Sequence, residues 1–411
     1  MSTKISRRNF VGLAGASLAA PFVSRIAHAA EDTVKIGLVA PTEGQALRDG
    51  RAYTNGFDAA VSYINDKGGI LGGKKIEAVY APQGLTGESA KSAALKLAER
   101  EKVKALVGPH WADTAPAGLS VAKRYNILFA PDQGGMWLYD QNYAGTLGLS
   151  CNSRARTMPQ MRWLEAKGYK SVVFLMCDIN YNREVDKMVR AQWEASGSKV
   201  KLLDIIYYPF GQTAIINEMT KAIGLSPDFL WFEEWSPTLA VTIMKSLHDL
   251  NYKGGVSLTA DLTQGDVDGV APELSEGIYS HMDYAPDMSV PANKAFVDYW
   301  QSKFGANKLP YRSEEIIWAQ TVFFLTAMDK AGTAGDGTPE GLAKIKAAMN
   351  EIDWTGPTGD KVRLTKSGLG LLPRTPMAQI KGGKLQVSEY LEMTPNDWVP
   401  DLPNSWDELK L

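Results

Sequence analysis

The stretch TVKIGLVAPT, residues 33–42, predicts a buried β-strand over residues 33–39 that ends in a loop. Apolar residues at helical spacing then predict a helix over residues 55–66. The segment NDKGG, residues 65–69, ends this helix because glycine readily takes the left-handed conformation that follows a helix. A second strand is predicted over residues 75–80, so the chain opens as a strand–helix–strand unit.

The same alternation continues and then restarts in the middle of the chain. The predicted strands are short and lack polar alternation, which indicates parallel sheets buried on both faces. Because the pattern runs twice without a visible sequence repeat, it predicts an α/β fold with two lobes of similar architecture. The expected strands cover residues 105–107, 127–130, 171–177, 200–207, 229–232 and 256–259, and the expected helices residues 88–102, 114–125, 182–196, 213–223 and 237–250.

The last third of the chain has a different pattern. Three helices are expected in succession, followed by short extended segments. The tail from Thr394 onward is rich in Pro, Asp, Asn and Trp, and we expect it to be irregular. The three helices cover residues 292–304, 313–331 and 338–350, and the extended segments residues 361–364, 377–380 and 385–387.

The N-terminal residues carry an export signal. SRRNFV, residues 6–11, is a twin-arginine motif, and an apolar stretch over residues 11–23 and the small residues 27–29 follow it. The alternative is a membrane anchor, but the stretch is too short and too rich in Gly and Ala to span a bilayer. We therefore expect residues 1–29 to be a cleaved twin-arginine signal peptide, and the protein to reach the periplasm already folded.

Charge, length and cysteine content restrict the function further. Removing the four basic residues of the signal changes the formal net charge from −2 to −6, which gives no reason to expect nucleic acid or an anionic membrane as partner. The 411 residues suit two domains, and we expect a soluble monomer. Cys151 and Cys177 leave open a disulfide or, as we favour, two buried thiols.

Catalytic signatures are absent from the sequence. It contains no nucleophile elbow, no His-Glu-x-x-His, no phosphate loop and no Gly-x-Gly-x-x-Gly after the first strand. His110, His248 and His281 lack partners at metal-ligand spacing. Glu233 and Glu234 are adjacent on a strand and face opposite ways, which favours separate carboxylates over an acid–base pair. We therefore expect no enzyme, no cofactor and no metal.

Aromatic and charged residues gather where the predicted strands end. Open parallel sheets bind ligands beyond the carboxyl ends of their strands. If the lobes face each other, these loops line a cleft that suits a small, partly apolar solute with a polar or charged head. The alternative is that each Trp covers the core of its own lobe, and we favour the cleft for the set as a whole. The set comprises His110, Trp111, residues 132–137, residues 180–182, residues 233–235 and Asp261.

Six short motifs, in this order and spacing, resemble the type I periplasmic solute-binding proteins of branched-chain (hydrophobic) amino acid uptake systems. The resemblance covers nearly the whole chain after the signal, and only the motifs together are specific. The motifs are VKIG (34–37), NDKGGI (65–70), LVGP (106–109), PDFLWF (227–232), PANKAF (291–296) and GPTG (356–359).

The resemblance implies two Rossmann-like lobes with parallel sheets, joined by three crossings that act as a hinge. Lobe one would take residues 30–152 and 283–370, and lobe two residues 153–282 and 371–411. The lobes would close on the ligand, and the closed form would dock on the membrane permease of an ATP-driven (ABC) importer without catalysis. A ligand-sensing module for a membrane receptor is the alternative, and an exported enzyme is a weaker one.

The resemblance also implies pocket positions. Where the family offers a Ser or backbone N–H to a ligand carboxylate, this chain has Trp111 and Ala112. In the next loop Asp132 and Gly134 stand where the family has a hydroxyl for the ligand ammonium. These departures favour an aromatic or otherwise unusual carboxylate. Further implied ligand-binding positions are Tyr181, Trp235, Asp261 and Tyr311.

The residues suggest how such a ligand is held. We expect rings to sandwich its apolar part and backbone N–H groups at helix N-termini to hold its anionic end. Arg48 and Arg51 either grip a carboxylate or lie solvated at the rim. The expected rings are Trp111, Trp235 and Tyr311, and the acids expected to pair an ammonium are Asp261 with Asp132 or Glu234.

Overall fold

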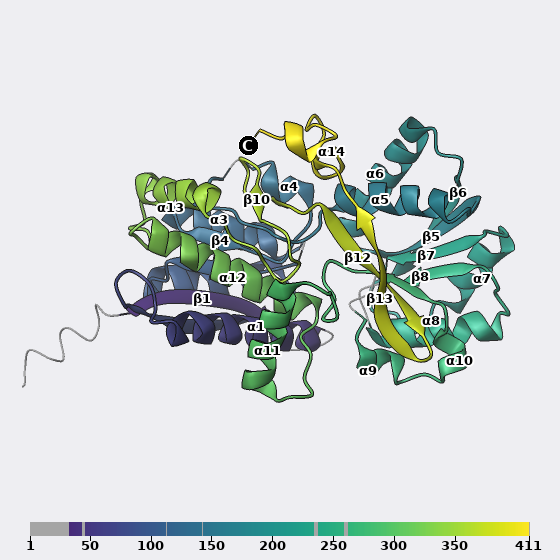
Figure 1. Cartoon of the computed structure of the whole chain (residues 1–411), viewed down its shortest axis with the longest axis horizontal. Coiled ribbons are helices and arrows are strands. Elements are labelled where there is room, and N and C mark those ends of the chain that lie inside the picture. Colours follow the sequence, from purple (N-terminus) through teal and green to yellow (C-terminus); the bar gives the residue numbers. More distant parts are fainter. Residues whose placement is uncertain are drawn as a thin grey trace, which may run out of the picture.

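Two lobes lie side by side, each built on its own β-sheet with helices packed against it (Figure 1). The predicted signal peptide, residues 1–29, lies outside the part of the chain that the structure describes. None of the described helices is long and apolar enough to cross a membrane. The computed structural model describes residues 33–42, 46–111, 113–141, 143–233, 237–258 and 262–410.

The first lobe has a parallel four-stranded sheet in the order β2-β1-β3-β4. Successive residues of the first strand point to opposite faces, so Leu38 joins the core formed with helices α1 and α12, and Val39 joins the core formed with α2 and α3. The strands are β1 (Thr33–Pro41), β2 (Lys75–Gln83), β3 (Ala105–Val107) and β4 (Leu128–Ala130). The helices that connect them are α1 (Leu47–Asp66), α2 (Gly87–Leu95), a π-helical segment (Lys96–Glu101) and α3 (Ala115–Tyr125).

Helices from the last third of the chain complete the first lobe. Helix α12 is buried along nearly its whole length, because α1 packs on one side of it and α13 on another. A small two-stranded ribbon lies beside them. These elements are α11 (Pro291–Phe304), α12 (Arg312–Lys330), α13 (Pro339–Glu351), β10 (Arg363–Leu364) and β11 (Gly370–Leu371).

The second lobe has a seven-stranded sheet in the order β13-β12-β9-β8-β7-β5-β6, parallel except for the two strands β12 and β13. In β5, Val173 and Leu175 face one core, and Val172 and Phe174 face the other. The strands are β5 (Ser171–Asp178), β6 (Lys201–Pro209), β7 (Phe229–Glu233), β8 (Gly255–Leu258), β9 (Tyr279–His281), β12 (Arg374–Lys381) and β13 (Lys384–Glu392), and the helices α5 (Ser153–Ala166), α6 (Asn180–Ser196), α7 (Ile216–Gly224), α8 (Pro237–Asp249), α9 (Gln264–Val267) and α10 (Pro272–Ser275).

The chain passes between the two sheets three times: between β4 and β5, after β9, and before β12. The tail beyond β13 lies above these crossings, where helix α14 (Pro395–Trp398) appears in yellow (Figure 1). Its Trp398 is fully buried in a core cluster with residues of the first lobe, such as Leu106 and Phe129. The division of the chain into lobes at residue 371 therefore stays a proposal, and the tail contacts the first lobe as well.

The order of strands and helices after the first strand is as predicted, with ends that differ by a few residues. Helix α1 begins at Leu47, eight residues earlier than expected. The tail expected to be irregular contains a short helix with a capping box between Thr394 and Asp397. Helix α5 and the short helices α4 (Met136–Tyr139), α9 and α10 have no counterpart in the sequence prediction.

Candidate functional site

A cavity of about 800 Å³ lies between the lobes, where the carboxyl ends of strands from both sheets meet. Loops after β3 and β4 form one wall, and the loops after β5 and β6 form the other. The crossing between the lobes contributes Cys151. This is the position where open parallel sheets bind their ligands.

On the first lobe, His110 and Trp111 follow β3, and Asp132 to Gly134 follow β4. A Cβ atom at Gly134 would lie 2.3 Å from the carbonyl oxygen of Cys151, so only glycine fits where this loop meets the crossing. The ring of Tyr53 packs against His110, with 3.9 Å between ring centroids and 35° between the ring planes.

His110 is a neutral side chain held in place by the β4 loop. Its Nδ1 accepts the backbone N–H of Asp132 at 2.8 Å, which places the ring hydrogen on Nε2. Burial, reinforced by the nearby charge of Arg312, lowers the pKa of His110 to about 3. Among the described residues Nε2 has no hydrogen-bond partner. The imidazole can therefore donate a hydrogen bond, and it is not a proton shuttle at neutral pH.

On the second lobe, the N-terminus of helix α6 forms part of the cavity wall. Ile179, Asn180 and Tyr181 line the cavity, and the N-cap residue Ile179 has no side-chain acceptor to satisfy the first turn. Backbone N–H groups at such an end attract negative charge. Further along, Tyr208 and Phe210 add aromatic surface.

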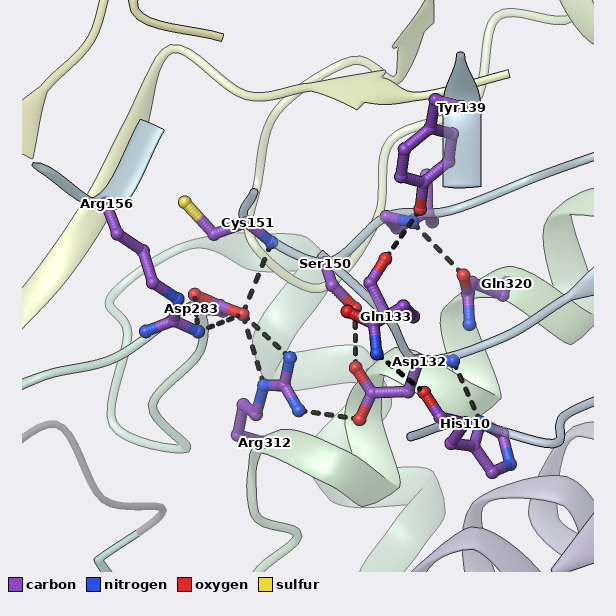
Figure 2. A network of polar contacts seen from close by, with 11 residues as sticks. His110, Asp132, Gln133, Tyr139, Ser150, Cys151, Arg156, Asp283, Arg312 and Gln320 are labelled. Carbon is purple, nitrogen blue, oxygen red and sulfur yellow. Dashed lines mark hydrogen bonds and ion pairs between the residues drawn. The ribbon is translucent and has the colours of Figure 1, made fainter. Parts of the chain in front are cut away.

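A buried network of charges joins the two lobes at the crossings (Figure 2). Arg156 from α5 contacts both oxygens of Asp283, at 2.9 and 3.0 Å. Arg312 from α12 contacts Asp283 at 3.0 Å and Asp132 at 2.6 Å. Ser150 donates to the other oxygen of Asp132 at 2.5 Å. Two guanidinium groups and two carboxylates thus pair with one another in a buried cluster at the cavity wall.

The ionisation of this network follows from burial and pairing. Burial alone would raise the pKa of Asp283, but Arg156 and Arg312 hold it below its ordinary value. Burial raises the pKa of neighbouring Glu315 to about 8, because Arg312 offsets only part of the cost of a charge there. At neutral pH Asp283 is therefore ionised, and Glu315 carries a proton.

Three polar contacts bridge the two lobes beside the cavity. Arg48 of α1 binds Asp266 of α9 through two bonds of 3.1 and 3.2 Å. Asn180 donates to Asp113, and Glu184 accepts the backbone N–H of Met136 at 3.0 Å. Each of these contacts joins residues from both lobes, so the lobes touch each other beside the cavity.

The structure brings together four of the predicted ligand-binding residues: Trp111, Asp132, Gly134 and Tyr181 all line the cavity. Asp132 already holds Arg312 and Ser150, so its carboxylate orients the network. Tyr311 is at the N-cap of α12 with Arg48 over its ring, at 5.3 Å, and is not among the described residues that line the cavity. The predicted positions Ala112, Trp235, Glu234 and Asp261 lie outside the described residues.

The other sequence predictions have mixed outcomes. Arg48 pairs with Asp266 at the cavity, whereas Arg51 is exposed and is not a described lining residue. His248 is a surface residue. Cys151 and Cys177 are buried thiols that form no disulfide, so the favoured alternative is confirmed. No group of His, Cys, Asp and Glu suited to hold a metal occurs among the described residues.

Sequence reasoning missed Arg156, Arg312 and Asp283, which form the base of the cavity and the network behind it. Arg312 directly follows Tyr311, at the start of a helix that was predicted. This position is the one signal in the sequence that could have identified Arg312. Arg156 is in a helix that was not predicted, and its partner Asp283 is 127 residues away.

Comparison with known proteins agrees with this architecture. A family model described as periplasmic binding protein matches residues 33–384. The Leu/Ile/Val-binding protein homolog 6 of Brucella melitensis is 24% identical over 335 residues, which cover 80% of this chain and 83% of that protein. The Brucella suis protein of the same name is also 24% identical over 335 residues, with the same coverage of both chains.

Solved structures show the same fold at low sequence identity. The leucine-binding protein LivK of Thermotoga maritima superposes with a TM-score of 0.75 at 18% identity, covering 89% of this chain and 100% of that one. A solute-binding protein of R. palustris in complex with benzoate superposes with a TM-score of 0.75 at 18% identity, covering 88% of this chain and 96% of that one. LivJ of Streptococcus pneumoniae in complex with isoleucine superposes with a TM-score of 0.74 at 20% identity, covering 88% of this chain and 99% of that one. The expected two-lobed α/β fold is confirmed.

Proposed function

Because the chain belongs to the periplasmic binding protein family, we propose that it is the extracytoplasmic substrate-binding component of an ABC importer. Its ligand is an amino acid or a related carboxylate, including aromatic ones, held between two lobes that close on it. The curated relatives are named as Leu/Ile/Val-binding proteins, and a structural neighbour holds benzoate, which supports this range.

The observation that carries the proposal is the cavity itself. Its lining comes from the carboxyl ends of both sheets, so a ligand inside contacts both lobes at once. Each lobe alone would cover only part of the ligand, and closure gains energy only when the ligand bridges them. The polar contacts across the cavity, such as Arg48 with Asp266, support a closed state that the ligand favours.

The described residues suggest a division of labour within the site. Arg156 and Arg312 reach the cavity wall, where their guanidinium groups, held by Asp283 and Asp132, present hydrogen-bond donors toward a ligand carboxylate. The N-terminus of α6 supplies backbone N–H groups on the opposite wall. Trp111 and Tyr181 supply rings for the apolar part. A carboxylate with an attached ring or aliphatic body matches these groups.

No catalytic step is needed for this role. Asp132 and Asp283 hold arginines, so these two carboxylates position the network. The protein would work as a monomer, deliver its ligand to a membrane permease, and leave the cytoplasm folded through the twin-arginine pathway. Replacing Arg7 and Arg8 by Lys should trap the precursor in the cytoplasm if that export route is correct.

Ligand binding is tested by a thermal-shift screen of amino acids, aromatic acids and aliphatic acids on purified protein, followed by calorimetry. A ligand that binds only the folded state raises the melting temperature by mass action. Small-angle scattering with and without the best ligand then measures closure. Failure of every solute to bind, with scattering that never changes, would refute the proposal.

A further inference from the structure

Two exposed apolar side chains face the cavity from opposite lobes. Leu85 follows β2 and is 38% exposed, and Phe210 follows β6 and is 51% exposed. Both line the cavity. Single exposed apolar residues are normal on a protein surface. Leu85 and Phe210, however, line one cavity from its two walls, and we call this pair the apolar rim, a surface that the apolar part of a ligand can cover.

The sheet topology places this apolar rim far from the charged network. In the first sheet, β2 is the edge strand and β4, which leads to Asp132, is the opposite edge. Three strand steps of about 4.8 Å separate them, or roughly 14 Å. In the second sheet β6 is likewise the edge strand, and β9, which leads to Asp283, lies four strands away. The cavity therefore extends from a charged base to an apolar rim.

The size of the cavity agrees with this extended shape. Its volume of about 800 Å³ is in the upper part of the range, about 300–1,000 Å³, of pockets that enclose drug-sized ligands. A free amino acid at the charged base would leave the space between Leu85 and Phe210 to water. A longer ligand would fill that space and remove apolar surface from water.

We infer that the ligand is an elongated amphiphilic carboxylate, and this inference rests on the proposed function. Its anionic head lies at the base, beside Arg156 and Arg312. Its tail, an acyl chain or an aryl-alkyl group longer than a standard amino-acid side chain, reaches the apolar rim. Leu85 and Phe210 then determine how long a tail the protein selects.

The test is calorimetry with a series of straight-chain carboxylates from butyrate to decanoate, with phenylacetate and 4-phenylbutyrate as the aromatic pair. Affinity should rise about fourfold per methylene until the tail passes the rim, as expected for burying each CH₂ group. In Phe210→Ser and Leu85→Ser, the gain in affinity for the longest members of the series should disappear. Both side chains are exposed, so neither substitution threatens the fold.

The matched control is Leu309→Ser, which removes a leucine that is 54% exposed and is not a described lining residue of the cavity. It should leave the whole series unchanged. The inference is overturned if short acids bind best, or if both rim variants keep the wild-type dependence on length, as they would if the rim served a docking protein. Either result leaves the proposed function standing, whereas a failure of all acids and amino acids to bind overturns both.

Discussion

Arg48 and Asp266 form a two-point ion pair between the lobes, from the first turn of α1 to helix α9. The two residues are 218 positions apart, and the pair exists only when the lobes are close together. It is partly exposed, so its contribution is modest and is reduced by salt. We therefore interpret it as a contact that favours the closed state without locking it.

The first prediction concerns this pair. Arg48→Gln should weaken ligand binding by up to about fivefold, because an exposed ion pair contributes roughly 0.2–1 kcal/mol. The loss should shrink at high salt. Calorimetry at low and high ionic strength measures both effects.

Arg51→Gln is the matched control, because Arg51 is an exposed arginine on the same helix. It should bind ligand like the wild type at every salt concentration. Equal losses in both variants would show that general charge, and not the pair with Asp266, is responsible.

The fold could be predicted because it depends on local patterns. Apolar strands such as β3 and β5, and helices ended by glycine or asparagine, are visible in the sequence alone. Helix α5 could not be predicted in this way, because it contains Pro159 and several arginines, which are typical of loops and exposed segments. Its burial arises from the crossing, the tail and the second sheet, which only the folded chain brings together.

The candidate site could be predicted only in part for a related reason. Trp111, Asp132 and Tyr181 follow strands, and topology brings the ends of parallel strands to one edge. Arg156 and Arg312 are in the first turns of their helices and bind an acid far away in sequence, and a single sequence holds no record of such pairing. A buried arginine also contradicts the usual expectation that charged residues are exposed.

The second prediction concerns the buried network. Asp283→Asn should lower the stability to unfolding by about 3–5 kcal/mol, because it leaves Arg156 and Arg312 buried without the charge that balances them. Denaturant melts followed by circular dichroism measure this change.

Asp298→Asn serves as the comparison, since Asp298 is in an exposed pair with Lys294. Its effect should stay within about 0.5 kcal/mol. If Asp283→Asn proved equally mild, the network would have no structural importance.

The third prediction concerns pH. The folded protein keeps the Glu315 proton up to about pH 8, whereas the unfolded chain releases it near 4.5. Unfolding therefore releases a proton between these values, and this group's contribution to stability falls as pH rises through that window. In Glu315→Gln this loss of stability should be absent. The variant should therefore become more stable relative to the wild type as the pH rises from 5 to 8.

The readout is the difference in melting temperature between the two proteins at each pH. Glu314, whose pKa burial raises to about 7, changes stability in the same direction but is present in both proteins and cancels in the difference. A constant difference across the window would contradict the raised pKa of Glu315.

The fourth prediction concerns the aromatic wall. Trp111→Ala should weaken binding by roughly 10- to 100-fold, since it removes a large ring from the cavity lining. Trp406→Ala removes a partly exposed tryptophan from the C-terminal tail and should not alter affinity, even if it lowers stability. Unchanged affinity in Trp111→Ala would remove this residue from the site.

The central claim is that the cleft between the lobes captures a carboxylate without altering it. The most direct measurement is calorimetric titration of the purified protein with the acids selected by the thermal-shift screen, with mass analysis of the ligand recovered afterwards. We predict saturable binding of one molecule per chain and recovery of the ligand intact. Absence of binding by any acid or amino acid, or recovery of a chemically changed product, would contradict the claim.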